Sequence, residues 1–313
     1  MSLAVASPPF GPDTLRGLET LALPVVAAAQ FVDLAQARLV GDGLAASLTL
    51  LAADTDAAAQ VAAPRAMLRA GGGALVAHSL PGIGLPPIQP ADFSGPSPLA
   101  GSRPYRLRVD DPQGRFLPLS ARLRAPALDA AAWPGWAALA TLQPASLRAS
   151  AQALLGDGRR WPLFGAPGRA NPGGLAEIRC NLVARDANAP VPAPVPAWVL
   201  IGIEHNGRLI GLGLSDARGA AVIHCAYPPL PAAMPIPPPG FAWPIRVRAW
   251  SHRLPAQPLP DLAAVLAQFD QPAQLFASRN PAAPLPLQNL RPGQPLSLRT
   301  TRPEGASELV IHA

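Results

Sequence analysis

The chain has 313 residues, 49% of them hydrophobic and 14% charged, which allows two or three domains with cores of their own and excludes a chain that is disordered throughout. All 25 basic residues are arginine, and with 19 acidic residues they give a net charge of +6. The arginines are spread along the chain and alternate with apolar residues instead of forming a patch, so we expect no nucleic acid as a partner. No apolar run of about 18 residues occurs, so we also expect no membrane insertion.

Proline is the outlier of the composition, with 42 residues of 313 against about 5% in an average protein. An interior proline destabilises a helix by roughly 3 kcal/mol, so this content leaves little room for long helices. Prolines are compatible with strand ends, edge strands and extended connections. We therefore predict a mainly β protein whose short strands are joined by stiff, ordered, proline-rich connections.

Residues 1–30 are predicted to form an N-terminal arm, helical or extended. The apolar run near its end could resemble a short signal peptide, but acidic Asp13 and Glu19 stand where a signal peptide carries basic residues, and Pro24 interrupts the run. We therefore expect no signal peptide and a cytoplasmic location.

Residues 31–126 are predicted to hold one or more β-sandwich units. Apolar segments here are separated by glycine-rich turns such as Gly71-Gly72-Gly73, and Pro86–Pro104 is predicted as an ordered connection or a linker. Tyr105–Val109 alternates apolar and polar residues and is followed by an aspartate- and glycine-containing turn, so we predict a hairpin with Phe116–Leu123.

Residues 127–175 are predicted to be an alanine- and proline-rich connection, in which Pro134 and Pro144 limit any helix to a short one.

Residues 176–229 predict a small β-sandwich domain. Asn206-Gly207 is a strong hairpin signal, because a type I′ turn needs positive φ at both central residues. The strands are expected at Ala176–Val183, Trp198–Glu204, Leu209–Leu214 and Ala220–Tyr227.

Residues 230–313 are predicted to form a C-terminal β segment with a short helix. Trp243–Trp250 has strand alternation, and Pro260–Phe269 has apolar residues at helical spacing behind a proline and an aspartate. Pro295–Thr301 and Ser307–His312 are predicted to form a final hairpin.

No catalytic, cofactor-binding or metal-binding residues are predicted, so we do not expect an enzyme. The sequence has no Gly-x-Ser-x-Gly elbow, no plausible Cys/His pair and no phosphate-binding glycine loop. The histidines are scattered without metal-ligand spacing; they are His78, His205, His224, His252 and His312.

The cysteines and tryptophans each leave two interpretations open. Cys180 and Cys225 have apolar neighbours two positions away, so both should face the core, either as a disulfide that adds roughly 4 kcal/mol or as buried thiols, which the absence of an export signal favours. The six tryptophans fit core or inter-domain packing, but exposed ones could also form a carbohydrate platform. They are Trp133, Trp136, Trp161, Trp198, Trp243 and Trp250.

One stretch resembles the carboxypeptidase regulatory-like, or prealbumin-like, β-sandwich. The residues that carry the resemblance are Asp186, Pro190, Trp198–Glu204, Asn206-Gly207, Ser215-Asp216-Ala217-Arg218-Gly219 and Tyr227-Pro228. With weak internal repeats elsewhere, the resemblance implies two or three Ig/prealbumin-like sandwich units and gives a fold rather than a role.

A second resemblance rests on the order of short motifs along most of the chain. They are Leu80-Pro81-Gly82, Arg115-Phe116-Leu117-Pro118, Pro162-Leu163-Phe164-Gly165-Ala166-Pro167, Gly173-Gly174-Leu175-Ala176, Asp216-Ala217-Arg218-Gly219 and Tyr227-Pro228. This order is similar to that of accessory proteins encoded among phage tail-like contractile injection system genes. The resemblance implies a structural component of the baseplate, cap or tail, with other tail or baseplate proteins as partners in a symmetric assembly. The alternative is a secreted adhesin or carbohydrate-binding module.

Overall fold

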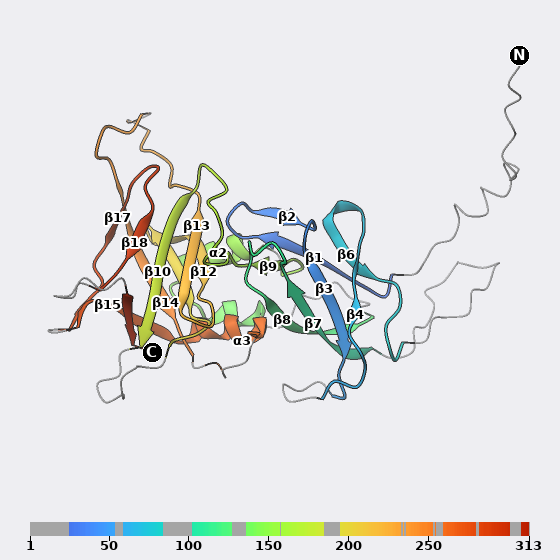
Figure 1. The fold of residues 1–313 in the computed structure, drawn as a ribbon. Coiled ribbons are helices and arrows are strands. Elements are labelled where there is room, and N and C mark those ends of the chain that lie inside the picture. Colours follow the sequence, from blue (N-terminus) through green and yellow to red (C-terminus); the bar gives the residue numbers. More distant parts are fainter. Residues whose placement is uncertain are drawn as a thin grey trace, which may run out of the picture.

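The computed structural model describes residues 25–53, 59–83, 102–126, 136–156, 158–184, 195–232, 234, 236–252, 254, 259–279, 282–300 and 308–312. Its character is mainly β, as predicted from the proline content. Figure 1 shows the strands of the first half at one end of the molecule and those of the second half at the other, with α2 and α3 between them.

The first half contains a five-stranded and a four-stranded sheet. The strands are β1 (Ala27–Asp33), β2 (Arg38–Val40), β3 (Ala45–Leu50), β4 (Arg65–Ala66), β5 (Leu68–Arg69), β6 (Ala74–Ala77), β7 (Arg103–Asp110), β8 (Leu119–Ala125) and β9 (Trp161–Leu163), with a 3₁₀ turn at Gly71–Gly73. One sheet has the order β2-β1-β6-β5 with β9 parallel to β1, and the other has the order β4-β3-β7-β8. Buried side chains of both sheets belong to one hydrophobic cluster.

The structure confirms the predicted hairpin, in which β7 and β8 pair antiparallel. It corrects the boundary of the N-terminal arm, because Ala27–Gln30 pairs with β6 as the first half of β1. The remainder of the predicted arm, residues 1–24, lies outside the described residues, as do 84–101 of the proline-rich connection.

The second half forms a ten-stranded sheet. Its strands are β10 (Ala176–Ala184), β11 (Leu200–His205), β12 (Arg208–Leu214), β13 (Ala220–Cys225), β14 (Trp243–Trp250), β15 (Pro272–Arg279), β16 (Ala282–Pro284), β17 (Gln288–Leu290), β18 (Leu296–Leu298) and β19 (Glu308–His312). The main order is β12-β11-β14-β15-β19-β10-β13, with β16, β17 and β18 pairing β15, β14 and β10. Asn206 and Gly207 have φ of 49° and 74°, which confirms the predicted type I′ hairpin between β11 and β12.

The ranges 176–229 and 230–313 share this sheet, since β14 pairs with β11 and β19 with β10. The predicted final hairpin is wrong. β18 and β19 both run parallel to β10 along the same edge, β18 beside Ile178–Cys180 and β19 beside Asn181–Ala184. Their apolar residues complete the core beside β10, and this burial outweighs the turn signal at Pro303-Glu304-Gly305, which lies outside the described residues.

The large sheet curls until its two ends, β12 and β13, face each other. Two glycines of β12 permit the approach: a Cβ on Gly213 would lie 2.4 Å from Cγ1 of Ile223, and one on Gly211 would lie 2.7 Å from Cβ of Cys225. Any larger residue would therefore push β12 away from β13.

The helices lie between the sheets. They are a 3₁₀ helix at Trp136–Thr141, α2 (Ala145–Leu155), and α3 (Leu262–Ala267) continued by a 3₁₀ turn at Gln268–Asp270. The structure confirms the helix predicted at Pro260–Phe269, and Asp261 caps it by accepting hydrogen bonds from the backbone N–H groups of Ala263 and Ala264. α2 begins immediately after Pro144, which limits the helix as expected.

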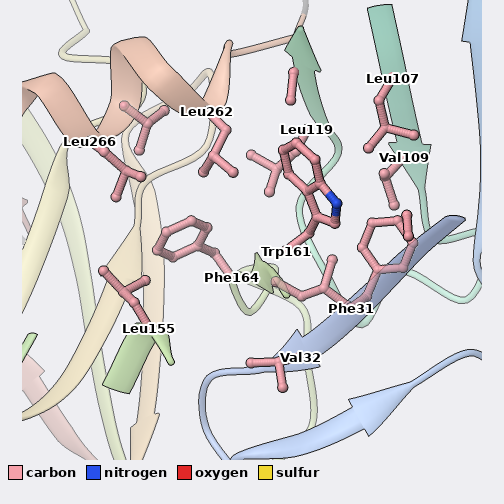
Figure 2. Close-up of a cluster of buried hydrophobic side chains, with 14 of the residues drawn as sticks. Phe31, Val32, Leu107, Val109, Leu119, Leu155, Trp161, Phe164, Leu262 and Leu266 are labelled. Carbon is pink, nitrogen blue, oxygen red and sulfur yellow. The ribbon is translucent and has the colours of Figure 1, made fainter. Parts of the chain in front are cut away.

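β11, most of β12 and the Trp250 end of β14 are buried on both faces, which joins the two halves. One face packs in the core of the large sheet, while Leu200, Leu214 and Trp250 on the other face belong to the cluster of the first half. Gly202 makes room there, since a Cβ would lie 2.8 Å from the ring of Trp250. Figure 2 shows part of this cluster, where side chains from sheets and helices meet around Trp161 and Phe164: Phe31, Leu107, Leu119, Leu155, Leu262 and Leu266.

Three sheet edges are covered by other parts of the chain. α2 covers β12, where Ser150 Oγ accepts a hydrogen bond from the backbone N–H of Leu209 at 2.9 Å. Gly165 lies against β13, because a Cβ on Gly165 would lie 3.6 Å from the carbonyl oxygen of Val222. On β8, the backbone N–H of Ser120 donates to Pro260 at 3.0 Å. Covered edges cannot pair with other chains.

Candidate functional site

Five charged or titratable side chains gather where the first half of the chain meets the large sheet. We call this group the junction network. It consists of Asp33 at the end of β1, Arg169 in the loop after β9, Glu177 and Arg179 on β10, and His224 on β13. Buried charged groups of this kind are frequent at functional sites, so the network is the first place to look for chemistry.

Asp33 and Arg169 form a buried, two-fold hydrogen-bonded ion pair. Arg169 Nη1 donates to Asp33 Oδ1 at 3.0 Å and Nη2 donates to Oδ2 at 2.6 Å. Asp33 is 0% exposed and Arg169 is 7% exposed. The guanidinium carbon also lies 4.7 Å from the centre of the Phe116 ring, and Asp33 accepts a further hydrogen bond from the backbone N–H of Ala35. Both charges are therefore satisfied by partners of the same chain.

His224 and Glu177 face each other across the β10–β13 pair. His224 Nε2 lies 3.5 Å from Glu177 Oε2. The side chain is 1% exposed, and within the described part of the chain neither ring nitrogen has a hydrogen-bond partner. Burial lowers the pKa of His224, and the nearby charge of Arg169 lowers it further, against the opposing effect of Glu177. The imidazole is therefore held neutral at neutral pH.

Glu177 is also bound to Arg179. Arg179 Nε donates to Glu177 Oε1 at 2.5 Å, and its Nη1 donates to the carbonyl oxygen of Pro167 at 2.9 Å. Burial raises the pKa of Glu177, but the hydrogen bond and charge of Arg179 outweigh burial, so the pKa lies below its usual value. Arg179 thereby connects β10 to the loop that carries Arg169.

The local backbone fixes this loop. The backbone N–H of Leu117 donates to the carbonyl oxygen of Phe164 at 2.9 Å, and that of Ala166 donates to the carbonyl oxygen of Arg115 at 3.0 Å. These bonds make a short antiparallel bridge between the β7–β8 turn and the segment after β9. The turn itself is held by Asp111, whose carboxylate accepts hydrogen bonds from the backbone N–H groups of Arg115 and Phe116. The bridge sets Arg169 over the Phe116 ring.

The contacts of the junction network connect the two halves, since Arg179 on β10 binds the carbonyl oxygen of Pro167 in the loop after β9. None of its five members is a serine or cysteine, and Cys225, which follows His224, faces the core on the opposite side of the strand. Its two carboxylates are each bound to an arginine. Among the residues that the structure describes, no group of three or more His, Cys, Asp or Glu side chains could hold a metal ion. A small hollow of about 10 Å³ between β1, β7, β8 and β9 is lined almost wholly by apolar side chains, and none of the five network residues lines it.

A larger hollow of about 330 Å³ is open and polar, beside the β17–β18 turn. The residues that line it are Leu287, Gln288, Asn289, Arg291, Gln294, Pro295 and Leu296. None of its polar groups is buried, so the hollow has no built ligand site.

The cysteines are two separate buried thiols. Cys180 pairs with Ala221 and Cys225 pairs with Ala176, so the two cysteines lie four positions apart along the β10–β13 ladder, roughly 13 Å at 3.3 Å per residue. A disulfide needs Cα atoms within about 7 Å, so the register excludes one between these cysteines. Burial raises the pKa of each thiol to about 12, which makes both unreactive.

The tryptophans that the structure describes are packed into cores. The exposed fraction is 9% for Trp161, 3% for Trp198, 6% for Trp243 and 3% for Trp250, and the half-buried Trp136 packs on the first cluster. Trp133 lies outside the described residues. Core packing is therefore the interpretation that the structure supports for these side chains.

Two other histidines are bound at positions away from the junction network. His205 Nδ1, at the end of β11, lies 2.8 Å from the carbonyl oxygen of Pro244, and His252 Nδ1, after β14, lies 3.0 Å from Gln271 Oε1. The sequence analysis missed the pair of Asp33 and Arg169. The available signal was an aspartate directly after an apolar run and an arginine at the end of a turn-rich motif, but nothing in the sequence connects the two positions.

Comparison of the chain with protein-family models, with curated proteins and with solved structures gave no match. Among the described residues, no helix is long and apolar enough to cross a membrane.

Proposed function

We propose that this protein is a structural component of a phage tail-like contractile injection particle, in its baseplate, cap or tail, and that it acts through protein–protein interfaces after assembly in the cytoplasm. The observation that carries the proposal is that the short motifs on which the resemblance rests make contacts within the fold. Arg115–Pro118 and Pro162–Pro167 bridge each other through their backbones and set Arg169 on Asp33. Their residues serve the architecture, as expected of a part that must keep its shape.

The other motifs of that order also make internal contacts. The carbonyl oxygen of Pro81 accepts a hydrogen bond from the hydroxyl of Tyr105 at 2.5 Å. The Tyr227 hydroxyl accepts one from the N–H of Gly293 at 2.8 Å, and its ring lies 5.3 Å from that of Trp243. We extend the proposal to the fold of the units, which we assign to Ig/prealbumin-like sandwiches on the basis of the paired sheets with shared cores.

The alternative, a secreted adhesin or carbohydrate-binding module, needs aromatic side chains open in a groove. The burial of Trp161, Trp198, Trp243 and Trp250 removes those side chains from consideration as a platform. The open hollow beside the β17–β18 turn has no aromatic residue in its lining. The geometry therefore favours the structural role over the alternative.

The proposal is tested by isolating the tagged protein from its native host and imaging what accompanies it by electron microscopy. We expect sheathed rod-shaped particles to accompany the protein, and we expect them to be lost or malformed when its gene is deleted. A protein that returns alone, with intact particles in the deletion strain, would contradict the proposal and lead to glycan arrays as the next measurement.

A further inference from the structure

The loop between β13 and β14 contains no charged residue. From Cys225 to Ile245 the chain has no Asp, Glu, Arg, Lys or His, and seven of the twelve residues 228–239 are proline. The described residues that are exposed in this loop are apolar or glycine, and Ile236, at 79%, is the most exposed large apolar side chain in the described part of the chain. A contiguous apolar stretch at the surface marks a site of interaction with another molecule.

Both ends of the loop are fixed to the large sheet. The hydroxyl of Tyr227 accepts a hydrogen bond from the N–H of Gly293 at 2.8 Å. At the other end, the ring of Phe241 packs edge-on against Trp243, with 4.9 Å between the ring centres, and Leu230 packs on the same core. The apolar groups near the base of the loop therefore contact the protein's own core, and its middle is presented on a fixed base.

The backbone of residues 236–239 is stiff and extended. A proline ring fixes its own φ at about −65° and also restricts the residue before it to extended conformations. Three prolines in a row follow Ile236, so these residues are held close to a polyproline II helix. The helix ends in a type II turn, where the N–H of Phe241 donates to the carbonyl oxygen of Pro238 at 3.0 Å and Gly240 has the φ of 83° that this turn needs.

The chemistry of this segment selects its partner. Pro237–Pro239 has no backbone N–H, so an added β-strand, which needs donors as well as acceptors, cannot cover it. The segment offers proline rings, one aliphatic side chain and carbonyl oxygens. These groups bind in grooves lined by tryptophan and tyrosine, whose rings pack on the prolines and whose N–H and O–H groups donate to the carbonyls. The lack of charge calls for a groove that is neutral as well.

A second copy of this chain and a lipid surface fit the segment less well. A lipid surface binds segments that combine a broad apolar face with lysine or arginine, and residues 225–245 have neither basic type. On a second copy, four tryptophans are buried and cannot line a groove: Trp161, Trp198, Trp243 and Trp250. The observations therefore favour a different protein as the partner.

We propose that residues 236–239 dock as a preformed polyproline II segment in a neutral, aromatic-lined groove of another protein. Ile236 and Pro239 lie on one side of the segment, because polyproline II repeats about every three residues, and this side enters the groove. The stiff backbone reduces the entropy lost on binding. The inference rests on the proposed function in one respect, since it names the kind of contact through which such a component would hold a neighbour.

The test uses the full chain and two purified probes that bind proline-rich segments in aromatic grooves, a WW domain and an EVH1 domain. Each probe is compared with a variant in which one aromatic residue of its groove is replaced by alanine. We expect at least one probe to bind, and its groove variant to bind about tenfold more weakly. Ile236→Asp, which places a charge in an apolar groove, and Pro237→Ala/Pro238→Ala, which frees the backbone, should each weaken binding about tenfold.

The matched control is Val61→Asp, whose side chain is 56% exposed in the first half of the chain and should leave binding unchanged. Ile236→Asp should keep the melting temperature close to that of the wild type, because its side chain is exposed. The loss of binding is then a property of the loop and not of unfolding.

No binding by either probe, binding that survives Ile236→Asp, or an equal loss from Val61→Asp would each overturn the inference. So would a dimer of the wild type, or its attachment to vesicles of neutral phosphatidylcholine, that Ile236→Asp abolishes. Isolation of the Ile236→Asp variant from the host separates the inference from the proposed function. Particles that accompany this variant as they accompany the wild type would refute the loop as the attachment site and leave the structural role standing. Probe binding without particles for the wild type would refute the role alone.

Discussion

Breaking the ion pair of Asp33 and Arg169 should destabilise the protein far more than breaking a surface pair. Asp33 is 0% exposed, and in Arg169→Met its carboxylate would keep, among the described donors, the N–H of Ala35. Removing one partner of a buried pair leaves an uncompensated charge and typically costs about 3–5 kcal/mol. The double variant Asp33→Leu/Arg169→Met should recover most of this loss, because it removes both charges together.

The measurement is the free energy of unfolding in guanidinium chloride, followed by tryptophan fluorescence and circular dichroism. Arg169→Met should also lower the melting temperature by roughly 10 °C. The matched control is Arg69→Met, whose arginine is 63% exposed and pairs with an exposed aspartate; it should change stability by less than about 1 kcal/mol. If Arg169→Met cost no more than the control, or if the double variant were no better than the single one, the reasoning from burial would be refuted.

Three further predictions follow from burial and packing. Because the pKa of His224 is lowered in the folded protein, the unfolded chain binds a proton first as pH falls below about 6.5. The free energy of unfolding should therefore decline from pH 7.5 to pH 5, and His224→Met should flatten that decline. An unchanged slope in the variant would contradict this reasoning. Cys180 and Cys225 should resist a thiol reagent in the folded protein and both react after unfolding, without prior reduction; one fast-reacting thiol, or none after unfolding, would count against the register. Gly213→Ala should lower the unfolding free energy by about 1–3 kcal/mol because its Cβ would enter β13, whereas Gly168→Ala, with open space around it, should have little effect; equal effects would show that β12 can shift freely.

Local signals in the sequence were sufficient for the local structure. Asn206-Gly207 predicts its turn because few other dipeptides tolerate positive φ twice. The helix at Leu262–Ala267 has its cap and its apolar spacing within one short stretch, and the strand period is enough to predict that Cys225 faces the core while His224 faces the opposite side. Each of these inferences depends on residues within a few positions of one another.

The parts that the sequence did not predict depend on pairing between distant positions. β18 and β19 look like the arms of a hairpin because a turn signal lies between them, but β10 offers one long edge that both can join in the same direction. The junction network likewise brings Asp33 together with Arg169 from more than a hundred positions away. No local pattern distinguishes a buried ion pair from two surface charges, because burial is decided by what packs on top.

The covered ends of the large sheet and the packing between the two halves connect the fold to the proposed role. The large sheet has one end protected by α2 and the other by the loop that carries Arg169. Its strands β11 and β12 are packed on both faces over most of their length. Motion between the two halves would expose Leu200 and Trp250 and would separate Arg179 from the carbonyl of Pro167, so the packing opposes a hinge at the junction. A body that resists bending at the junction is suited to transmit load from one neighbour to another in an assembly, as the proposed role requires.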